Sequence, residues 1–215
     1  MNTGDEIVAA IGATDGSVPQ VRELRRRYSK QFSNSSGEEM LRLAHRLIRG
    51  DDLARFVAYE LVHFHAETPA RIGEREVRTL GAGMQSWGAV DSFAFYIAGP
   101  AWKRGQIDDG VIASWARSTD RWWRRAALAS TVTLNRKPVA KNNVRRTLAI
   151  CSMLKADRDD MVVKALSWAL RELAKVDAAV VKRFLDDHDA ILAARVKREV
   201  LNKLRTGLKA PKARP

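Results

Sequence analysis

The residues whose types and spacing are best suited to chemistry lie between Trp87 and Arg125. Trp87 and Asp91 are four positions apart, so on a helix they lie on one face, one turn from each other. This spacing places a carboxylate beside an indole within an otherwise apolar segment. A tryptophan on a helix is most often a core residue, and a lone aspartate is often merely exposed. The apolar neighbours of Asp91 argue against full exposure, so we treat the pair as a candidate site.

Tryptophans and arginines meet in a second segment, Asp120-Arg121-Trp122-Trp123-Arg124-Arg125. Consecutive residues on a helix point about 100° apart, because one turn takes about 3.6 residues. Trp122 and Trp123 therefore cannot share one role, and neither can Arg124 and Arg125. We expect one of the two tryptophans to lie in the core.

A third group lies on the segment that begins near residue 159. Lys164 and Trp168 are four positions apart and Arg171 follows three later, so all three share a helix face. A stripe of cation, aromatic and cation packs poorly in a core. It is better suited to the wall of a groove that binds an anionic ligand.

The positive charge of the chain, +13 over 215 residues, is concentrated in two runs. The run from Arg121 to Arg146 has eight Lys or Arg residues, Lys141 among them, and no acid. The run from Arg195 to Pro215 has eight more against Glu199 alone. A solvated helix face explains most charge runs. An acid-free run with interleaved tryptophans favours phosphate contact, and nucleic acid over a membrane surface.

Other chemistries find little support in the residue pattern. His63 and His65 are two positions apart and diverge on a helix, so they do not form a metal pair. No nucleotide-binding glycine loop is present, and we expect neither a metal nor a cofactor. Cys151 is the single cysteine and has helical spacing to Val144 and Leu148, so we expect a buried, inert thiol.

The elements that must position these residues are predicted to be helices alone. No segment alternates strictly between apolar and polar residues, and no hairpin turn separates strand-like runs. The first three helices are expected to begin near Ser17, after the break at Ser33 to Ser36, and at Asp51 or Asp52, with the third ending before Pro69. Further helices are expected at about 74–83, 87–98, 107–117, 120–135, 140–154, 159–175, 177–187 and 190–206, with Pro100 and Pro138 in breaks.

The rhythm of these helices predicts the architecture. Each pair with its connections takes about 40 residues, the period of HEAT-type repeats. We predict an all-α superhelical stack of antiparallel helix pairs with a concave basic groove, and keep a compact irregular bundle as the alternative. Residues 1–17 are predicted to be a flexible N-terminus, 18–207 one domain and 208–215 a basic tail.

The sequence also carries expectations about location and assembly. It has no run of about 18 apolar residues and no basic N-terminal region of a signal peptide. We therefore expect a cytoplasmic protein associated with the nucleoid, with no membrane partner, and a monomer.

Four stretches together resemble the DNA alkylation repair enzymes of the AlkD type, which are HEAT-like-repeat DNA glycosylases. They occur in the family's order with similar spacing, and span about residues 18 to 187. The stretches are Val18 to Leu24 with Leu41 to Leu47, Trp87-Gly88-Ala89-Val90-Asp91, Trp115 to Ser118 leading to Trp123-Arg124-Arg125-Ala126-Ala127, and Lys164 to Glu172.

The resemblance implies excision of N-alkylated purines, such as 3-methyladenine and 7-methylguanine, from duplex DNA. Asp91 matches the family's catalytic carboxylate, while Trp87 and Trp168 match its aromatic walls. Arg125 matches the arginine that contacts DNA at the site, and Arg171 a further phosphate contact. Charge and position add Arg124, Lys164 and Lys141 to the predicted DNA-binding residues.

One departure from the family pattern concerns the segment before Val18, which is short and polar where relatives have a fuller helix. The range of lesions therefore stays open. Two rivals to the glycosylase also stay open. One is a non-catalytic HEAT-repeat protein that binds damaged or branched DNA, and the other is a helical scaffold for an acidic protein partner.

Overall fold

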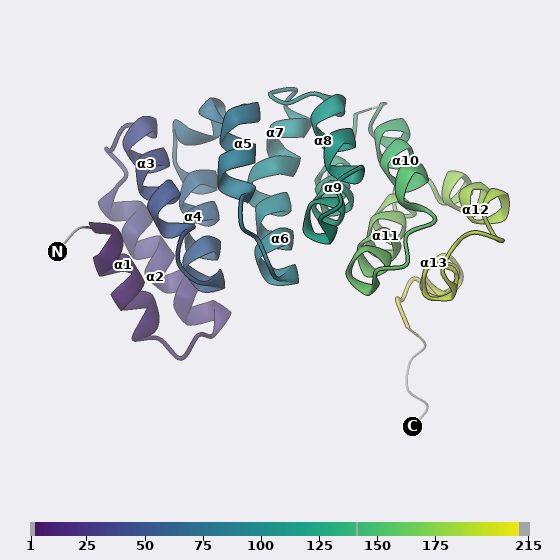
Figure 1. The fold of residues 1–215 in the computed structure, drawn as a ribbon, viewed down its shortest axis with the longest axis horizontal. Helices are drawn as coiled ribbons and strands as arrows, with labels where there is room; N and C mark the ends of the chain where they lie inside the picture. The colour runs from purple at the N-terminus through teal and green to yellow at the C-terminus, as the bar shows by residue number, and fades with distance from the viewer. Residues whose placement is uncertain (1–2, 141, 211–215) are drawn as a thin grey trace. The chain divides into compact units, whose positions relative to one another are not determined.

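The computed structural model describes residues 3–140 and 142–210, and every regular element in these ranges is a helix (Figure 1). This confirms the all-α prediction. None of the helices in the described ranges is both long and apolar enough to cross a membrane. The chain divides into two compact units, Met1–Ile107 and Asp108–Pro215. The span predicted from sequence as one domain, 18–207, is thus shared between these units.

The helices of unit 1 form two layers. The bounds are α1 Thr3–Gly12, α2 Val18–Gln31, α3 Gly37–Leu47, α4 Asp52–Phe64, η1 Thr68–Arg71, α5 Glu74–Gly81, α6 Trp87–Phe93, η2 Ala94–Ala98 and α7 Gly99–Lys103. One layer holds α2, α4 and the continuous α6–η2 run, with α4 in the middle, and α3 and α5 pack outside it.

Two inner helices of unit 1, α2 and α4, run parallel to each other. The guanidinium of Arg22 lies over the ring of Phe56, and that of Arg25 over the ring of Phe64, so α2 and α4 advance together. Consecutive helices such as α3 and α4 reverse direction across short connections (Figure 1). Within this unit the alternation matches the predicted stack of antiparallel helix pairs.

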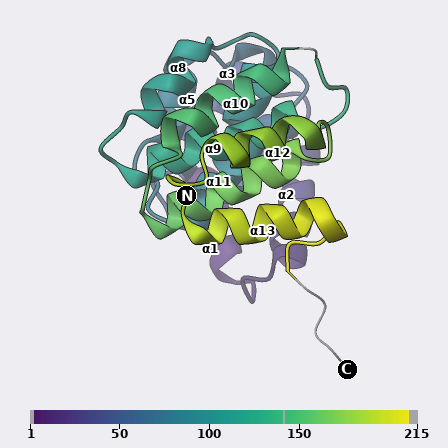
Figure 2. The ribbon, with the colours of Figure 1, turned by 90° about the vertical axis from the view of Figure 1, so that its right-hand side faces the viewer.

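Unit 2 repeats the same layering. Its helices are α8 Asp109–Ala116, α9 Arg121–Leu134, α10 Asn143–Leu154, α11 Asp160–Leu173, α12 Ala178–Asp187 and α13 Ala194–Thr206. α11 packs against α9, α10, α12 and α13, and Figure 2 shows α10 and α12 above α11 and α13. Contacts join the starts of α9, α11 and α13, so these three helices run parallel.

Local sequence signals explain where the helices begin. The hydroxyl oxygen of Ser36 accepts a hydrogen bond from the backbone N–H of Glu39, whose carboxylate accepts from the backbone N–H of Ser36. This reciprocal pair is a capping box. Asp159 caps α11 by accepting from the backbone N–H of Met161 at 2.9 Å. Such caps satisfy donors that the first helical turn leaves unpaired.

Two local expectations are wrong. The segment 1–17, predicted to be flexible, contains helix α1, whose Ile7 and Ile11 are buried. The apolar spacing of these two residues outweighs the small and polar residues around them. Pro100, expected in a break, is instead the second residue of α7. Pro100 follows the π-helical turn Ala94–Ala98, where the hydrogen-bond register of the helix shifts, and the helical run continues through it.

Candidate functional site

Trp87 and Asp91 lie on one face of α6, as the spacing predicted. The hydroxyl of Ser86 caps this helix by accepting from the backbone N–H of Ala89 at 3.1 Å. Trp87 is the first residue of α6, and 62% of its surface is exposed. Asp91 is half-buried. The opposite face of α6 carries buried Phe93, which packs on Tyr59 of α4.

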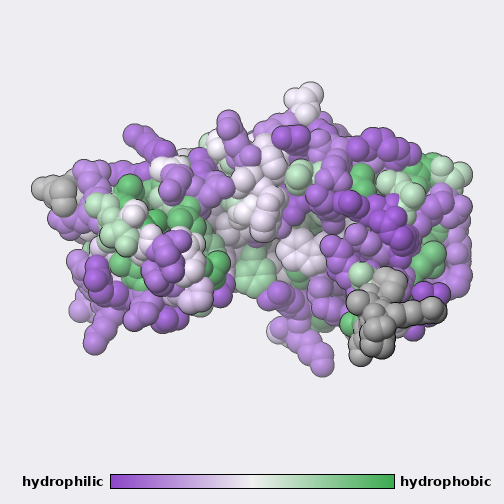
Figure 3. All heavy atoms as spheres, turned by 90° about the horizontal axis from the view of Figure 1, so that it is seen from below, coloured by the Kyte–Doolittle hydropathy of each residue, from purple (hydrophilic) through white to green (hydrophobic). Residues whose placement is uncertain are grey.

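The exposure of Trp87 decides between the two readings of this residue. Trp102, by contrast, is 1% exposed and belongs to the core. The indole of Trp87 is therefore not a core residue, and together with the half-buried carboxylate of Asp91 it is accessible to a ligand. Hydrophilic side chains cover most of the face drawn in Figure 3, with smaller apolar patches between them.

A polar and aromatic cluster that the sequence reasoning missed lies on α2, α4 and η2. The carboxylate of Glu60 is 1% exposed and accepts hydrogen bonds from Nε of Arg22 at 3.0 Å and of Arg25 at 2.8 Å. Arg22 also donates to the hydroxyl of Tyr96 at 3.1 Å. The sequence signal for this cluster is Glu60, an acid within the apolar stretch of α4, because a buried charge needs a paired cation.

The π-helical turn η2 brings Tyr96 into this cluster. The backbone N–H of Gly99 donates to the carbonyl of Ala94, five residues earlier, which shifts the helix register by one position. The backbone carbonyl of Tyr96 then lies 3.0 Å from Nδ1 of His63, and burial raises the pKa of the Tyr96 hydroxyl. Such π-helical turns are frequent at functional sites.

In unit 2, Arg125 is buried and bonded to protein. Only 6% of its surface is exposed, and Nη1 donates to the carbonyl of Met161 at 2.7 Å. Arg124 pairs with Asp157 at 2.7 Å and donates to the carbonyls of Ser118 and Thr119. Both arginines thus hold the connections around the starts of α9 and α11, and DNA contact by either stays a prediction.

The two tryptophans at the start of α9 differ as expected, although both are half-buried. Trp123 packs on the buried ring of Trp115, with ring centroids 4.9 Å apart. Trp122 lies under the guanidinium of Arg121 at 4.8 Å. Trp123 is therefore the member of the pair that joins the core.

The predicted stripe on α11 is partly open to solvent. Lys164 and Trp168 are half-buried, and Nζ of Lys164 lies 2.6 Å from the Asp160 carboxylate. Arg171 donates from Nε to the hydroxyl of Ser167 at 3.2 Å and lies 3.8 Å from Glu199. Burial lowers the pKa of Arg171, and Glu199 acts in the opposite direction.

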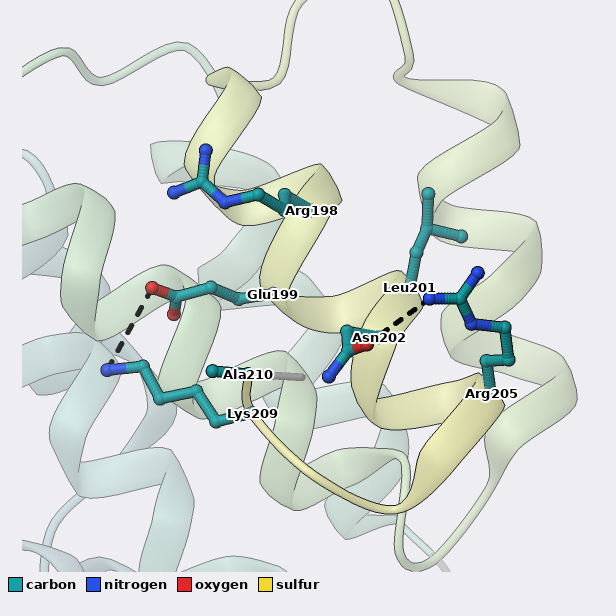
Figure 4. Close-up of a pocket in the computed structure, with 7 residues that line it drawn as sticks. All are labelled: Arg198, Glu199, Leu201, Asn202, Arg205, Lys209 and Ala210. Atoms are coloured by element: carbon teal, nitrogen blue, oxygen red, sulfur yellow. Dashed lines mark hydrogen bonds and ion pairs between the residues drawn. The ribbon is translucent and has the colours of Figure 1, made fainter. Parts of the chain in front are cut away.

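A basic pocket of about 510 Å³ lies beyond this stripe, along α13 and the segment after it (Figure 4). Its lining is Arg198, Glu199, Leu201, Asn202, Arg205, Lys209 and Ala210. Glu199 points toward Lys209, at 3.8 Å, and also accepts a hydrogen bond from Ser167 at 2.7 Å. Glu199 therefore connects the pocket to the hydroxyl that holds Arg171.

The remaining predictions concern metals, the thiol and Lys141. In the part of the chain that the structure describes, no group of three or more His, Cys, Asp or Glu side chains is placed to hold a metal ion. Cys151 is buried, as predicted, and burial raises the pKa of its thiol to about 12, which favours the unreactive thiol form. Lys141, a predicted DNA-binding residue, lies outside the described residues.

Comparison with known proteins gives one match. The model of the DNA alkylation repair enzyme family matches residues 16–204, a range that spans α2 to α12, most of α13 and all the predicted site residues. Neither a curated protein nor a solved structure matches the chain. The resemblance seen in the four sequence stretches is thereby confirmed, and the chain belongs to the family of DNA alkylation repair enzymes.

Proposed function

We propose that this protein is a monofunctional, metal-free DNA glycosylase that excises cationic N-alkylated purines from duplex DNA as the first step of base excision repair. The observation that carries the proposal is the exposed indole of Trp87 one helical turn from the half-buried carboxylate of Asp91. Family membership supports a role in DNA alkylation repair. We further propose that the protein acts as a monomer in the cytoplasm.

The chemistry of the lesion explains why one carboxylate is enough. A purine alkylated at N3 or N7 already carries a positive charge and leaves as a neutral base, so no general acid is needed. Most glycoside hydrolases need a second carboxyl group to protonate the leaving group. Positive charge instead builds on the deoxyribose as the bond breaks. Asp91 stabilises that charge and orients the attacking water.

The size of this effect can be bounded from Coulomb's law. A carboxylate roughly 4 Å from the developing charge contributes about 4 kcal/mol at an effective dielectric of about 20. This corresponds to roughly a thousandfold in rate. The faces of Trp87 and Trp168 each contribute on the order of 1–2 kcal/mol toward a desolvated cation.

The cations of both units supply affinity for the DNA backbone in this proposal. Lys164 and Arg171 are the candidates on α11, and we retain Arg124, Arg125 and Lys141 as further contacts. Each phosphate that they neutralise steepens the dependence of binding on salt by about 0.9 in a plot of log affinity against log salt. In this proposal the enzyme contacts the DNA backbone and does not need to flip the base into a closed pocket. A site without a closed pocket can accept bulky adducts.

The decisive experiment compares wild type with Asp91→Asn. Release of 7-methylguanine from methylated duplex DNA is measured for both, together with duplex affinity. We expect release to fall at least about a hundredfold with affinity kept, because the lost charge acts on the transition state. Glu38→Gln is a matched control, since Glu38 is an exposed carboxylate of unit 1 paired with Arg42.

The result also separates the rival function. Binding without release by either protein would reject the enzyme and leave a non-catalytic protein that binds damaged or branched DNA. Release that is unchanged in Asp91→Asn would keep the enzyme but remove Asp91 from its catalytic role.

A further inference from the structure

Asp160, the first residue of α11, joins two cations from different helices. Its Oδ2 lies 2.6 Å from Nζ of Lys164 on the same helix, and its Oδ1 accepts a hydrogen bond from Nη1 of Arg195 on α13 at 2.9 Å. The Asp160 side chain is 59% exposed. Both of its ion pairs therefore face solvent.

A third cation lies behind this exposed group. The guanidinium of Arg125, fixed on the carbonyl of Met161, contributes to the field at Asp160. The hydrogen bond from Lys164, followed by the charges of Lys164, Arg195 and Arg125, lowers the pKa of the Asp160 carboxyl. One carboxylate thus lies among three cations from α9, α11 and α13.

The neighbouring acid does not change this balance. Asp159 is bonded to the backbone N–H groups of Met161 and Val162 and lies 3.6 Å from Arg121. The two acids Asp159 and Asp160 and the four cations that pair with them or act on them together carry a net charge of +2; these cations are Arg121, Arg125, Lys164 and Arg195. A cluster with surplus positive charge that faces solvent is suited to a second anion.

We propose that Lys164 and Arg195 form a subsite for a phosphate of the DNA backbone, and that Asp160 fills this subsite in the free protein as a competing anion. The inference rests on the DNA binding of the proposed function, and adds Arg195 and Asp160 to it. Carboxylate and phosphodiester oxygens accept charge-assisted hydrogen bonds from the same donors. Exposed ion pairs contribute little to stability, so DNA displaces Asp160 from its partners at low cost.

Removal of the negative charge of Asp160 should tighten binding, because this charge occupies the proposed phosphate subsite. Asp160→Asn keeps the shape of the side chain but no longer competes for Lys164 and Arg195. We expect it to bind undamaged duplex DNA about three- to tenfold more tightly than wild type, with an equal or steeper salt dependence. Arg195→Gln should weaken binding and reduce the log–log salt slope by about 0.9.

The matched control is Asp186→Asn on α12. Asp186 is as exposed as Asp160 and also pairs with a lysine four positions away on its own helix, Lys182, at 2.7 Å. Its ion pair stays within α12, so its loss should leave duplex affinity within about twofold of wild type.

The test measures duplex affinity at four or more salt concentrations for wild type, Asp160→Asn, Arg195→Gln, the double variant and Asp186→Asn. Circular dichroism confirms that each is folded. In the Arg195→Gln background the gain from Asp160→Asn should shrink, because the two residues act through one contact. Unchanged or weaker binding by folded Asp160→Asn overturns the proposal. If that variant does not fold, unchanged affinity and salt slope in Arg195→Gln overturn it.

A further arm distinguishes DNA from free phosphate. Inorganic phosphate is titrated into Asp160→Asn while thermal unfolding is followed. Stabilisation by phosphate without any gain in DNA affinity would assign the subsite to a small anion and overturn its assignment to the DNA backbone. Because all affinities use undamaged duplex, loss of the proposed excision activity would not alter the reading of this experiment.

Discussion

The guanidinium of Arg125 donates a hydrogen bond to the backbone carbonyl of Met161 at 2.7 Å, which ties the second turn of α9 to the first turn of α11. This bond places the start of α11 and, through it, Asp160 and Lys164. A residue predicted from family resemblance to contact DNA therefore also has a structural task. The two roles make different predictions for its removal.

We expect Arg125→Ala to lower the free energy of unfolding by about 2–4 kcal/mol, because it removes the hydrogen bond to Met161 and leaves a cavity where the buried side chain packed. Duplex affinity and excision should fall together. Urea unfolding and duplex binding measure the two effects, with exposed Arg117→Ala as the control. Unchanged excision in a folded Arg125→Ala protein would remove Arg125 from the site.

Trp168→Ala should abolish most excision while the protein stays folded, because Trp168 is only half-buried on α11. The contrast is Trp102→Ala, which deletes a fully buried indole and should cost about 3–5 kcal/mol. Thermal unfolding and 7-methylguanine release are measured for both variants. A collapsed melting transition in Trp168→Ala would show that this residue is core and not a wall of the site.

Stability should fall as the pH drops below about 6.5, the usual titration range of histidine. Burial lowers the pKa of both His45 and His63, so the unfolded chain takes up protons that the folded protein resists. Among the residues that the structure describes, the buried Nε2 of His45 finds no hydrogen-bond partner. The stabilisation from the two neutral histidines is thus present above the pKa of histidine in the unfolded chain, and it is lost as the pH falls below that value.

Urea unfolding between pH 5 and 8 tests this dependence on the two histidines. The slope of unfolding free energy against pH should flatten in the double variant His45→Gln/His63→Gln. His188→Gln serves as the control, since it removes a histidine that is also half-buried but lies at the end of α12, in the other unit of the chain. An equally steep slope in the double variant would assign the acid sensitivity to other groups.

Cys151 should resist alkylation at pH 8 in the folded protein, because burial raises the pKa of the thiol to about 12 and the thiolate is the reactive form. In urea the thiol returns to a pKa near about 8.5 and should react readily. The raised folded pKa also means that its stabilisation is complete below about pH 8.5 and declines as the pH rises toward 12. Mass spectrometry after timed iodoacetamide treatment measures the reaction, and rapid labelling without urea would contradict the burial.

Much of the local structure could be predicted from short-range patterns. Two examples are the serine that caps the helix with Met40 and the four-residue spacing of Trp87 and Asp91. Both depend only on residues close together in the chain. Helix ends and helix faces follow from such spacing, because each backbone hydrogen bond of an α-helix joins residues only four positions apart. The sequence by itself thus determined an all-α chain and a carboxylate one turn from an indole.

The tertiary structure decided which of these side chains is accessible. Trp87 and Trp102 are the same residue type on neighbouring helical segments, yet one is 62% exposed and the other 1%. Asp160 meets Arg195 from 35 residues away, and Glu60 meets Arg22 from 38. Burial and ion pairing depend on which helices pack together, and residues so distant in sequence become neighbours only when those helices pack.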